Sequence, residues 1–465
     1  MSKRAAICAF LLVLTLFFPH ASAAMRSGRS QFLWLSDIHF NPFYDPTLVD
    51  KLAAAPPSDW TAILNSSSST KLPSFGQDAN WPLLSSAFLA IKRTIPAPAF
   101  TIVTGDLMAH HFREQFDATA TAHDDHAFGE FARKTVEFIG LQLNQLSPDT
   151  RSIVALGNND SDCGDYFTES DGPFLRSTGP PIAALAGAAD NSSFSAPWNG
   201  FGSFSVRHPV LRKHRIVVLD TTFLSSRHRN GCAAASVDAG SAMLTWLTHE
   251  LADARQHGDK VWLVYHIPPG VDGFATIRSG ASSANASVTF WKDSYSTTFE
   301  ELSKQYRSTV EASFAGHTHM DDFRLINQDD GPPSVVMLTP ALGPNVRQNP
   351  SFRIVTLSSR GKLQDQATYY LANLAKVSQQ VPADWKLEYS FKQAWNLRGL
   401  NAGNYEKLWR RTAASSRDRG RWTLFYSASA PGPFIPPDTF GTYHCASGYT
   451  NAREFADCVG KEQPN

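Results

Sequence analysis

The chain has 465 residues, and its 42 lysine and arginine residues balance 42 aspartate and glutamate residues. Zero net charge and only 18% charged residues argue against partners that are nucleic-acid polymers or anionic membranes. The length suits one large catalytic domain together with a smaller one.

Residues 1–23 have the three parts of a secretory signal peptide. Lys3 and Arg4 precede the apolar run 5–18, and Ala21-Ser-Ala23 is typical of a cleavage site after Ala23. We therefore expect a secreted protein, located outside the cell or in the endolysosomal lumen, or in the periplasm if the host is bacterial. An uncleaved anchor is the alternative. No later stretch is long and apolar enough to be an integral membrane segment.

Four cysteines follow the predicted cleavage site: Cys163, Cys232, Cys445 and Cys458. An even number of cysteines in an exported protein predicts two disulfides, although three pairings and free thiols are open. We favour Cys445–Cys458, which are close in sequence, and hence Cys163–Cys232. Sequons at Asn65, Asn191 and Asn285 predict glycosylation if the host is eukaryotic.

Two apolar runs near the start of the mature chain each end in metal-ligating residue types. Residues 32–36 precede Asp37 and His39, and residues 100–104 precede Gly105 and Asp106. Helical spacing between these runs predicts a βαβ unit, as expected for an α/β fold. Asp106 would then lie at the carboxyl end of a strand, where open α/β sheets bind their ligands.

Three later strand-like runs also end in polar residues. These residues are Asn158 and Asn159 after the third run, His266 after the next, and His317 with His319 after the last. Residues 161–202 resemble a loop that could form a lid or rim over the site. The sequence becomes aromatic and helix-compatible after about residue 361. We therefore predict a catalytic domain at 24–360 and a C-terminal helical subdomain at 361–465.

Imidazole, carboxylate and amide groups at five strand ends are the ligands that suit zinc, iron or manganese. In Asp37-x-His39 and His317-x-His319, alternate residues of an extended segment point to the same side and can converge on one ion. A carboxylate such as Asp106 can bridge two ions about 3.5–4 Å apart. The pattern therefore predicts a hydrolytic site with two divalent metal ions.

This ordered set resembles the calcineurin-like metallophosphoesterase superfamily, whose pattern is DxH, GD, GNH[DE], H and GHxH. The details look like its acid sphingomyelinase branch, because segments 105–110, 266–270 and 316–323 match GDxxAH, HxPPG and GHTHxDxF. The resemblance implies a four-layer β-sandwich flanked by helices and a C-terminal helical subdomain. It also implies two metal ions, for which zinc is our first choice. One ion would take Asp37, His39, Asp106 and His319, and the other Asp106, Asn158, His266 and His317.

The chain departs from this pattern at Asn159, where the superfamily usually has histidine. Asn159 can donate a hydrogen bond to a phosphoryl oxygen, but it cannot transfer a proton near neutral pH. His110 is then the candidate acid. The same GNND sequence also occurs in endopolyphosphatase-like relatives of the branch. Asp78 either lines the site or caps a loop.

Only a few residues separate the predicted signal from the first strand, so we expect no saposin domain. The chain thus looks like the saposin-less acid sphingomyelinase-like phosphodiesterases, whose substrates include nucleotides and other soluble phosphoesters. We expect a secreted metal-dependent phosphodiesterase that acts on a small phosphoester rather than on membrane sphingomyelin. The alternatives are an endopolyphosphatase or phosphomonoesterase at the same site, and a secreted binding protein that has lost catalysis.

Overall fold

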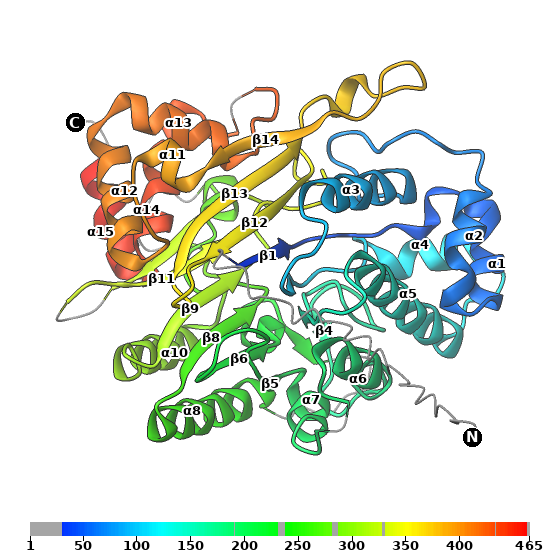
Figure 1. Cartoon of the computed structure of the whole chain (residues 1–465), viewed down its shortest axis with the longest axis horizontal. Coiled ribbons are helices and arrows are strands. Elements are labelled where there is room, and N and C mark those ends of the chain that lie inside the picture. The colour runs from blue at the N-terminus through cyan, green and yellow to red at the C-terminus, as the bar shows by residue number, and fades with distance from the viewer. Residues whose placement is uncertain are drawn as a thin grey trace, which may run out of the picture.

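The structure is a computed structural model that describes residues 30–189, 191–230, 238–280, 287–327, 331–432 and 434–462 (Figure 1). The predicted signal peptide, Cys232 and the Asn285 sequon lie outside these ranges. No helix within them is long and apolar enough to cross a membrane.

The first sheet has six strands in the order β14-β13-β12-β1-β2-β3. Strands β1, β2 and β3 are parallel, as the predicted βαβ unit requires, whereas β12, β13 and β14 add antiparallel pairs. The bounds are β1 Ser30–Leu35, β2 Thr101–Thr104, β3 Ser152–Ala155, β12 Ser351–Leu357, β13 Leu363–Leu371 and β14 Trp385–Ser390.

The second sheet also has six strands, in the order β10-β11-β9-β8-β6-β5. Its four central strands are parallel and its two edge strands are antiparallel. The bounds are β5 Phe204–Arg207, β6 His214–Leu219, β8 Lys260–Tyr265, β9 Val310–Ala315, β10 Phe323–Ile326 and β11 Ser334–Leu338. A short parallel pair joins β4 (Phe167–Thr168) to β7 (Arg229–Asn230).

The two sheets pack face to face through large aromatic side chains. Phe32 and Trp34 of β1 contact Phe314 of β9, with the Trp34 and Phe314 ring centroids 5.0 Å apart. In β8, Trp262 and Val264 join this inter-sheet core, whereas the alternate residues of the strand join a second core. Both faces of β8 are therefore buried, which explains its continuous apolar sequence.

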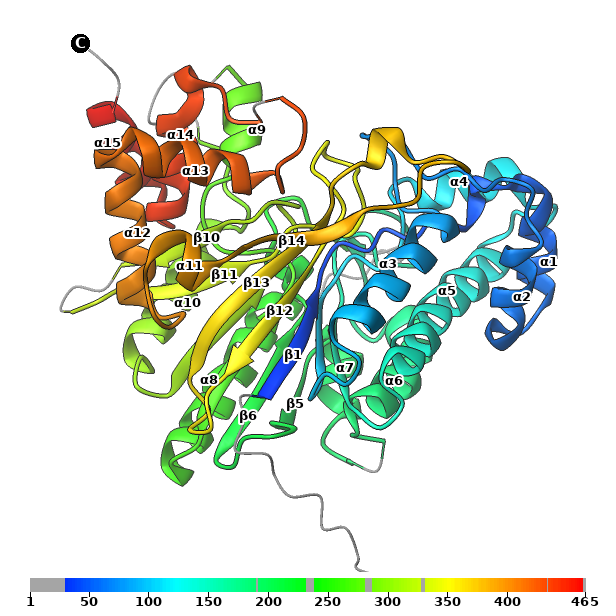
Figure 2. The ribbon, with the colours of Figure 1, turned by 45° about the horizontal axis from the view of Figure 1, so that its top comes forward.

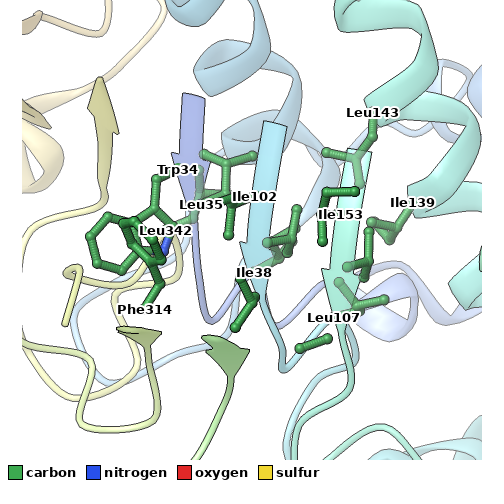
Figure 3. Packing of buried hydrophobic residues seen from close by; sticks show 14 of the residues in the cluster. Trp34, Leu35, Ile38, Ile102, Leu107, Ile139, Leu143, Ile153, Phe314 and Leu342 are labelled. Atoms are coloured by element: carbon green, nitrogen blue, oxygen red, sulfur yellow. The ribbon is translucent and has the colours of Figure 1, made fainter. Parts of the chain in front are cut away.

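Helices cover the outer faces of both sheets (Figures 1 and 2). On the first sheet, α5 packs against β3, and Figure 3 shows Ile139 and Leu143 beside Ile153. On the second sheet, α8 and α10 bury Leu247 and Phe299 against β6 and β8. The predicted α/β sandwich flanked by helices is confirmed. The bounds are α3 Trp81–Thr94, α5 Asp125–Leu146, α6 Pro173–Ala186, α8 Ala239–His257 and α10 Asp293–Gln305.

Shorter helices occupy the connections between these elements. They are α1 Val49–Ala54, α2 Trp60–Asn65, α4 Phe112–Thr119, α7 Ser195–Phe201 and α9 Gly273–Arg278. The prediction that residues 161–202 form a loop is wrong, because α6 and α7 lie there. Helix α6 tolerates Pro180 and Pro181 because its apolar face, including Phe174 and Ile182, is buried next to α5 and β3.

The C-terminal segment becomes helical later than residue 361, since β13 and β14 first extend the sheet. Strand β13 alternates between more and less buried residues, which is typical of a strand with one covered face. The helices that follow lie beside β10 and β14 in Figure 2: α11 Phe391–Trp395, α12 Ala402–Ala414, α13 Ser416–Tyr426, α14 Phe440–Gly448 and α15 Ala452–Glu462. The predicted disulfide Cys445–Cys458 is confirmed and joins α14 to α15. The second pairing stays a prediction.

Candidate metal centre and active site

The seven predicted metal ligands lie together where strands of the two sheets end. Asp37 and His39 follow β1, Asp106 follows β2 and Asn158 follows β3, whereas the other three follow β8 and β9. Ligand atoms of Asp37, His39, Asp106 and His319 all lie within 4.8 Å of one another, and the same holds for Asp106, His266 and His317. All are buried except the half-buried His317.

The backbone at these ligands has an uncommon conformation. Asp37, His39, Asp106, His317 and His319 all have positive φ, between 44° and 72°. This left-handed region is disfavoured for residues other than glycine, and such residues concentrate at functional sites. The chain therefore turns sharply at each strand end, which directs neighbouring side chains toward one centre.

Two motif glycines make room for the carboxylates. A Cβ atom at Gly157 would collide with the Asp106 carboxylate, and one at Gly316 would collide with Ser36 Oγ and the Asp37 carboxylate. The glycines of the GNND and GHTH sequences therefore allow the two sheets to bring their ligands together.

The first group is centred on His39. Its Nδ1 lies 3.1 Å from the carbonyl oxygen of Met108, so this nitrogen is the donor and Nε2 carries a lone pair. His39 Nε2 lies 3.2 Å from His319 Nε2 and 3.4 Å from Asp106 Oδ2. His319 Nε2 also lies 3.2 Å from Asp37 Oδ1.

The second group is centred on His266 in the same way. Its Nδ1 lies 2.7 Å from the carbonyl oxygen of Thr104, so Nε2 carries the lone pair. His266 Nε2 lies 3.1 Å from both Asp106 Oδ2 and Asn158 Oδ1, and 3.2 Å from His317 Nδ1. Asp106 therefore belongs to both groups.

The charges at the site favour cations. Burial would raise the pKa of Asp106, but His266 and His39 lower it far below its usual range, so the carboxylate is ionised. Burial would lower the pKa of His266, but Asp106 and Asp37 raise it to about 10, so the site stabilises a positive charge at this ring, and a metal ion would displace the proton from Nε2. Lone pairs of imidazole, carboxylate and amide groups face one another in both groups, and this donor set fits two divalent metal ions.

Two further carboxylates hold the ligand loops in place. Buried Asp160 accepts hydrogen bonds from the backbone N–H groups of Leu107, Met108 and Gly157. Asp165 accepts a hydrogen bond of 2.6 Å from Asn158 Nδ2, which leaves Asn158 Oδ1 facing His266. Sequence reasoning assigned no role to either residue, although the acid in GNND was a signal for Asp160.

Asn159 lies against the Asp106 carboxylate. It is buried, its Nδ2 donates to Asp106 Oδ2 at 2.9 Å, and its backbone N–H donates to Asp106 Oδ1 at 2.9 Å. Its amide therefore contacts a metal-ligand candidate rather than the cavity where a phosphoryl oxygen would lie.

His110 lies beside the first group, with its ring stacked on His39 at 4.2 Å between centroids. Asp78 accepts hydrogen bonds from His110 Nδ1 at 2.8 Å and from its backbone N–H at 2.9 Å. Burial lowers the pKa of His110, but Asp78 raises it above its ordinary value. Asn345 Nδ2 also donates to Asp78 at 2.9 Å. Asp78 therefore contacts both the ring and the backbone of His110.

A cavity of about 320 Å³ opens over the metal-ligand groups and is lined by Asp106, Asn158, His317, His319 and His110. Its walls also carry six aromatic side chains: Tyr166, Phe274, Phe290, Tyr426, Phe434 and Tyr443. The last three come from the aromatic C-terminal segment. Asp322 and Arg324, a buried ion pair, complete the wall on the β10 side.

Comparisons with known proteins agree with the sequence resemblance. The chain is 26% identical over 426 residues to human acid sphingomyelinase-like phosphodiesterase 3b, covering 87% of this chain and 84% of the relative. It is 25% identical over 433 residues to sphingomyelinase phosphodiesterase D of Dictyostelium discoideum, covering 87% of this chain and 90% of that relative. It is 24% identical over 388 residues to human cyclic GMP-AMP phosphodiesterase SMPDL3A, covering 80% of this chain and 76% of that relative.

No protein-family model matches the chain. Among solved structures, a dimetal phosphatase from Danio rerio aligns with a TM-score of 0.42 and 11% identity, covering 77% of this chain and 99% of that chain.

Proposed function

We propose that this chain, a relative of the acid sphingomyelinase-like phosphodiesterases among the calcineurin-like metallophosphoesterases, hydrolyses small soluble phosphodiesters. It is a metal-dependent phosphoric ester hydrolase. One observation supports the two-metal site above all others: Asp106 Oδ2 lies between His39 Nε2 and His266 Nε2, at 3.4 and 3.1 Å. We assign the first metal to Asp37, His39, Asp106 and His319, and the second to Asp106, Asn158, His266 and His317, with zinc as the proposed metal.

When bound, the metal ions stabilise negative charge on the phosphoryl oxygens and acidify a water molecule. The protein's residues supply the remaining functions. Asp106 would be shared by the two ions, and Asn159 orients the Asp106 carboxylate. Asn158 adds a neutral ligand, which limits the negative charge that an anionic phosphate would meet.

His110 is the proposed proton donor to the leaving oxygen. Asp78 occupies Nδ1, so Nε2 is the nitrogen that can face a substrate in the cavity. Asp78 also favours the protonated ring, which an acid needs before it donates. Asn159 cannot take this role, because it is an amide directed at Asp106.

The cavity supports a substrate with an organic substituent rather than bare phosphate. Aromatic side chains form much of its wall, and planar groups pack favourably against such surfaces. We propose that the enzyme is exported, on the basis of the N-terminal signal sequence, and acts in the extracellular space or the endolysosomal lumen.

Substitution of Asp106 tests the metal centre. We expect Asp106→Asn to abolish hydrolysis and to reduce bound metal, since a neutral amide replaces the shared carboxylate. His110→Ala should lower turnover while metal content, measured by elemental analysis, stays at about two ions per chain. Full activity in a metal-depleted Asp106→Asn protein would contradict the proposal.

A comparison of chromogenic substrates tests the reaction class. We expect bis(4-nitrophenyl) phosphate to be hydrolysed with a higher kcat/KM than 4-nitrophenyl phosphate. The reverse order would favour a phosphomonoesterase, and shortening of polyphosphate chains would favour an endopolyphosphatase. Two bound ions without turnover of any phosphoester would point to a binding protein that has lost catalysis.

A further inference from the structure

We propose that the active site has a second arm, which binds a hydrophilic, negatively charged substituent of the phosphodiester. This inference rests on the proposed function. The second arm is the cavity of about 740 Å³ between the segment 69–80 and the start of α4. A phosphodiester carries two organic substituents, and the structure offers one cavity for each.

The two cavities meet beside the metal-ligand groups. His110 and Val346 line both, so the His110 ring stands at the junction. Asp106 and His319 also line the first cavity, and Asp78 and Asn345 also line the second. A phosphorus atom at the metal centre could therefore extend one substituent into each cavity.

The linings of the two cavities differ in chemistry. The first has six aromatic side chains beside several charged groups, including Arg227, whereas the second has no phenylalanine or tryptophan among the described residues that line it and carries many amide and hydroxyl groups, among them those of Asn41, Ser74 and Gln77. Asp78 is the second cavity's carboxylate, and His110 and Asn345 already bind it. Among the residues that line the second cavity, Lys71 is the single lysine or arginine, and it is exposed. Its ammonium group favours an anionic ligand.

Hydrogen bonds hold the walls of this cavity before any ligand arrives. Asn80 Nδ2 donates to the carbonyl oxygen of Lys71 at 2.7 Å, which anchors the backbone that carries the ammonium group. Gly76 N donates to the carbonyl oxygen of Pro344 at 2.9 Å, which ties the segment to the loop before Asn345. A pre-formed site loses less conformational entropy when a ligand binds.

The expected substrate class is therefore a diester with a planar aromatic group on one side and a phosphate-bearing polar group on the other. Three esters that share the 4-nitrophenyl group test this inference. They are the 4-nitrophenyl esters of thymidine 5′-phosphate, of thymidine 3′,5′-bisphosphate and of phosphorylcholine. In both thymidine esters the 4-nitrophenyl group is on the 5′-phosphate. The second substituent of that phosphodiester is uncharged thymidine in the first ester, thymidine with an anionic 3′-phosphate in the second, and cationic choline in the third.

For the wild-type enzyme, we expect the added 3′-phosphate to raise kcat/KM about fivefold at low ionic strength. In Lys71→Glu, this preference should vanish or reverse. The kcat/KM of the phosphorylcholine ester should rise relative to that of the thymidine 5′-phosphate ester. Lys92→Glu is the matched control, because Lys92 is an exposed lysine on α3 that does not line the cavity. It should leave two kcat/KM ratios as in the wild type: that of the bisphosphate ester to the thymidine 5′-phosphate ester, and that of the phosphorylcholine ester to the thymidine 5′-phosphate ester.

Two results would overturn the inference. One is a wild-type enzyme that is indifferent to the 3′-phosphate, and the other is an equal change of the ratios in Lys71→Glu and Lys92→Glu. Failure of the proposed function gives a different result, because the metal-loaded wild type would then hydrolyse none of the three diesters.

Discussion

The side-chain amide of Asn159 donates to Asp106 Oδ2, and the backbone N–H of the same residue donates to Asp106 Oδ1, each at 2.9 Å. Both oxygens of the shared carboxylate are thus held by one residue. At this position the superfamily pattern has a histidine, which can transfer protons, whereas the amide of Asn159 is directed at the Asp106 carboxylate.

We expect Asn159→Leu to weaken metal binding about tenfold, because it removes the side-chain donor but keeps a similar volume. Titration of the metal-free protein with Zn²⁺ would measure this change. The melting temperature of the metal-free variant would serve as a control for folding. Unchanged metal affinity would mean that the backbone N–H alone suffices to orient Asp106.

Asp78 should affect turnover without affecting the metals. Asp78→Asn keeps a hydrogen-bonding side chain next to His110 but removes the charge that stabilises the protonated ring. We expect kcat to fall at least about tenfold, with KM changed little and two ions retained. A decrease confined to substrates with poor leaving groups would identify the step as leaving-group protonation. An equal decrease for 4-nitrophenyl esters and alkyl esters would contradict that role.

Glu311 should make stability depend on pH. Burial would raise its pKa, but hydrogen bonds from His214 and Lys362 lower it to about 2. Since the folded-state pKa lies below the unfolded value, the contribution of Glu311 to the free energy of unfolding is present above about pH 4.5 and is lost as the pH falls toward 2. The partner His214 has a raised pKa, so its own contribution is lost as the pH rises above its ordinary value of 6.5.

We therefore expect Glu311→Gln to be less stable than the wild type by about 1 kcal/mol at pH 5.5, with the difference shrinking below pH 4.5 and disappearing near pH 2. Urea unfolding at several pH values, with metal present, would measure both curves. Glu406→Gln is the control, since its partner Arg410 is largely exposed. A difference that does not depend on pH would mean that the effect arises from packing.

The Cys445–Cys458 disulfide should stabilise the cavity wall. It closes a loop of 13 residues between α14 and α15. In the chain-entropy model, such a loop contributes about 3 kcal/mol. We expect the double variant Cys445→Ser/Cys458→Ser to lose about that much stability and to bind aromatic substrates more weakly, because α14 carries Tyr443. Weaker binding would appear as a higher KM; an unchanged KM would show that the wall keeps its position without the bond.

The sequence by itself predicted which seven residues lie together as candidate metal ligands. Asp37-x-His39 and His317-x-His319 combine short spacing with strand ends, and Asp106, Asn158 and His266 occupy the same place after other strands. Residue types at strand ends indicated the cluster, because the carboxyl ends of parallel strands meet at one edge of a sheet, and the family resemblance supplied the division into two groups. The expectation that His317 and His319 converge on one ion from an extended segment is wrong: both have positive φ, and they belong to different groups.

The sequence also named His110 as the candidate acid, but only the tertiary structure decided which residues contact it. Asp78, His110 and Asn345 are separated by 32 and 235 residues along the chain, so no local pattern could join them. The direction of the Asn159 amide and the use of Tyr426 and Tyr443 as cavity walls depend on packing between distant elements. Sequence periodicity reports which face of an element is buried, but it does not report which distant element covers that face.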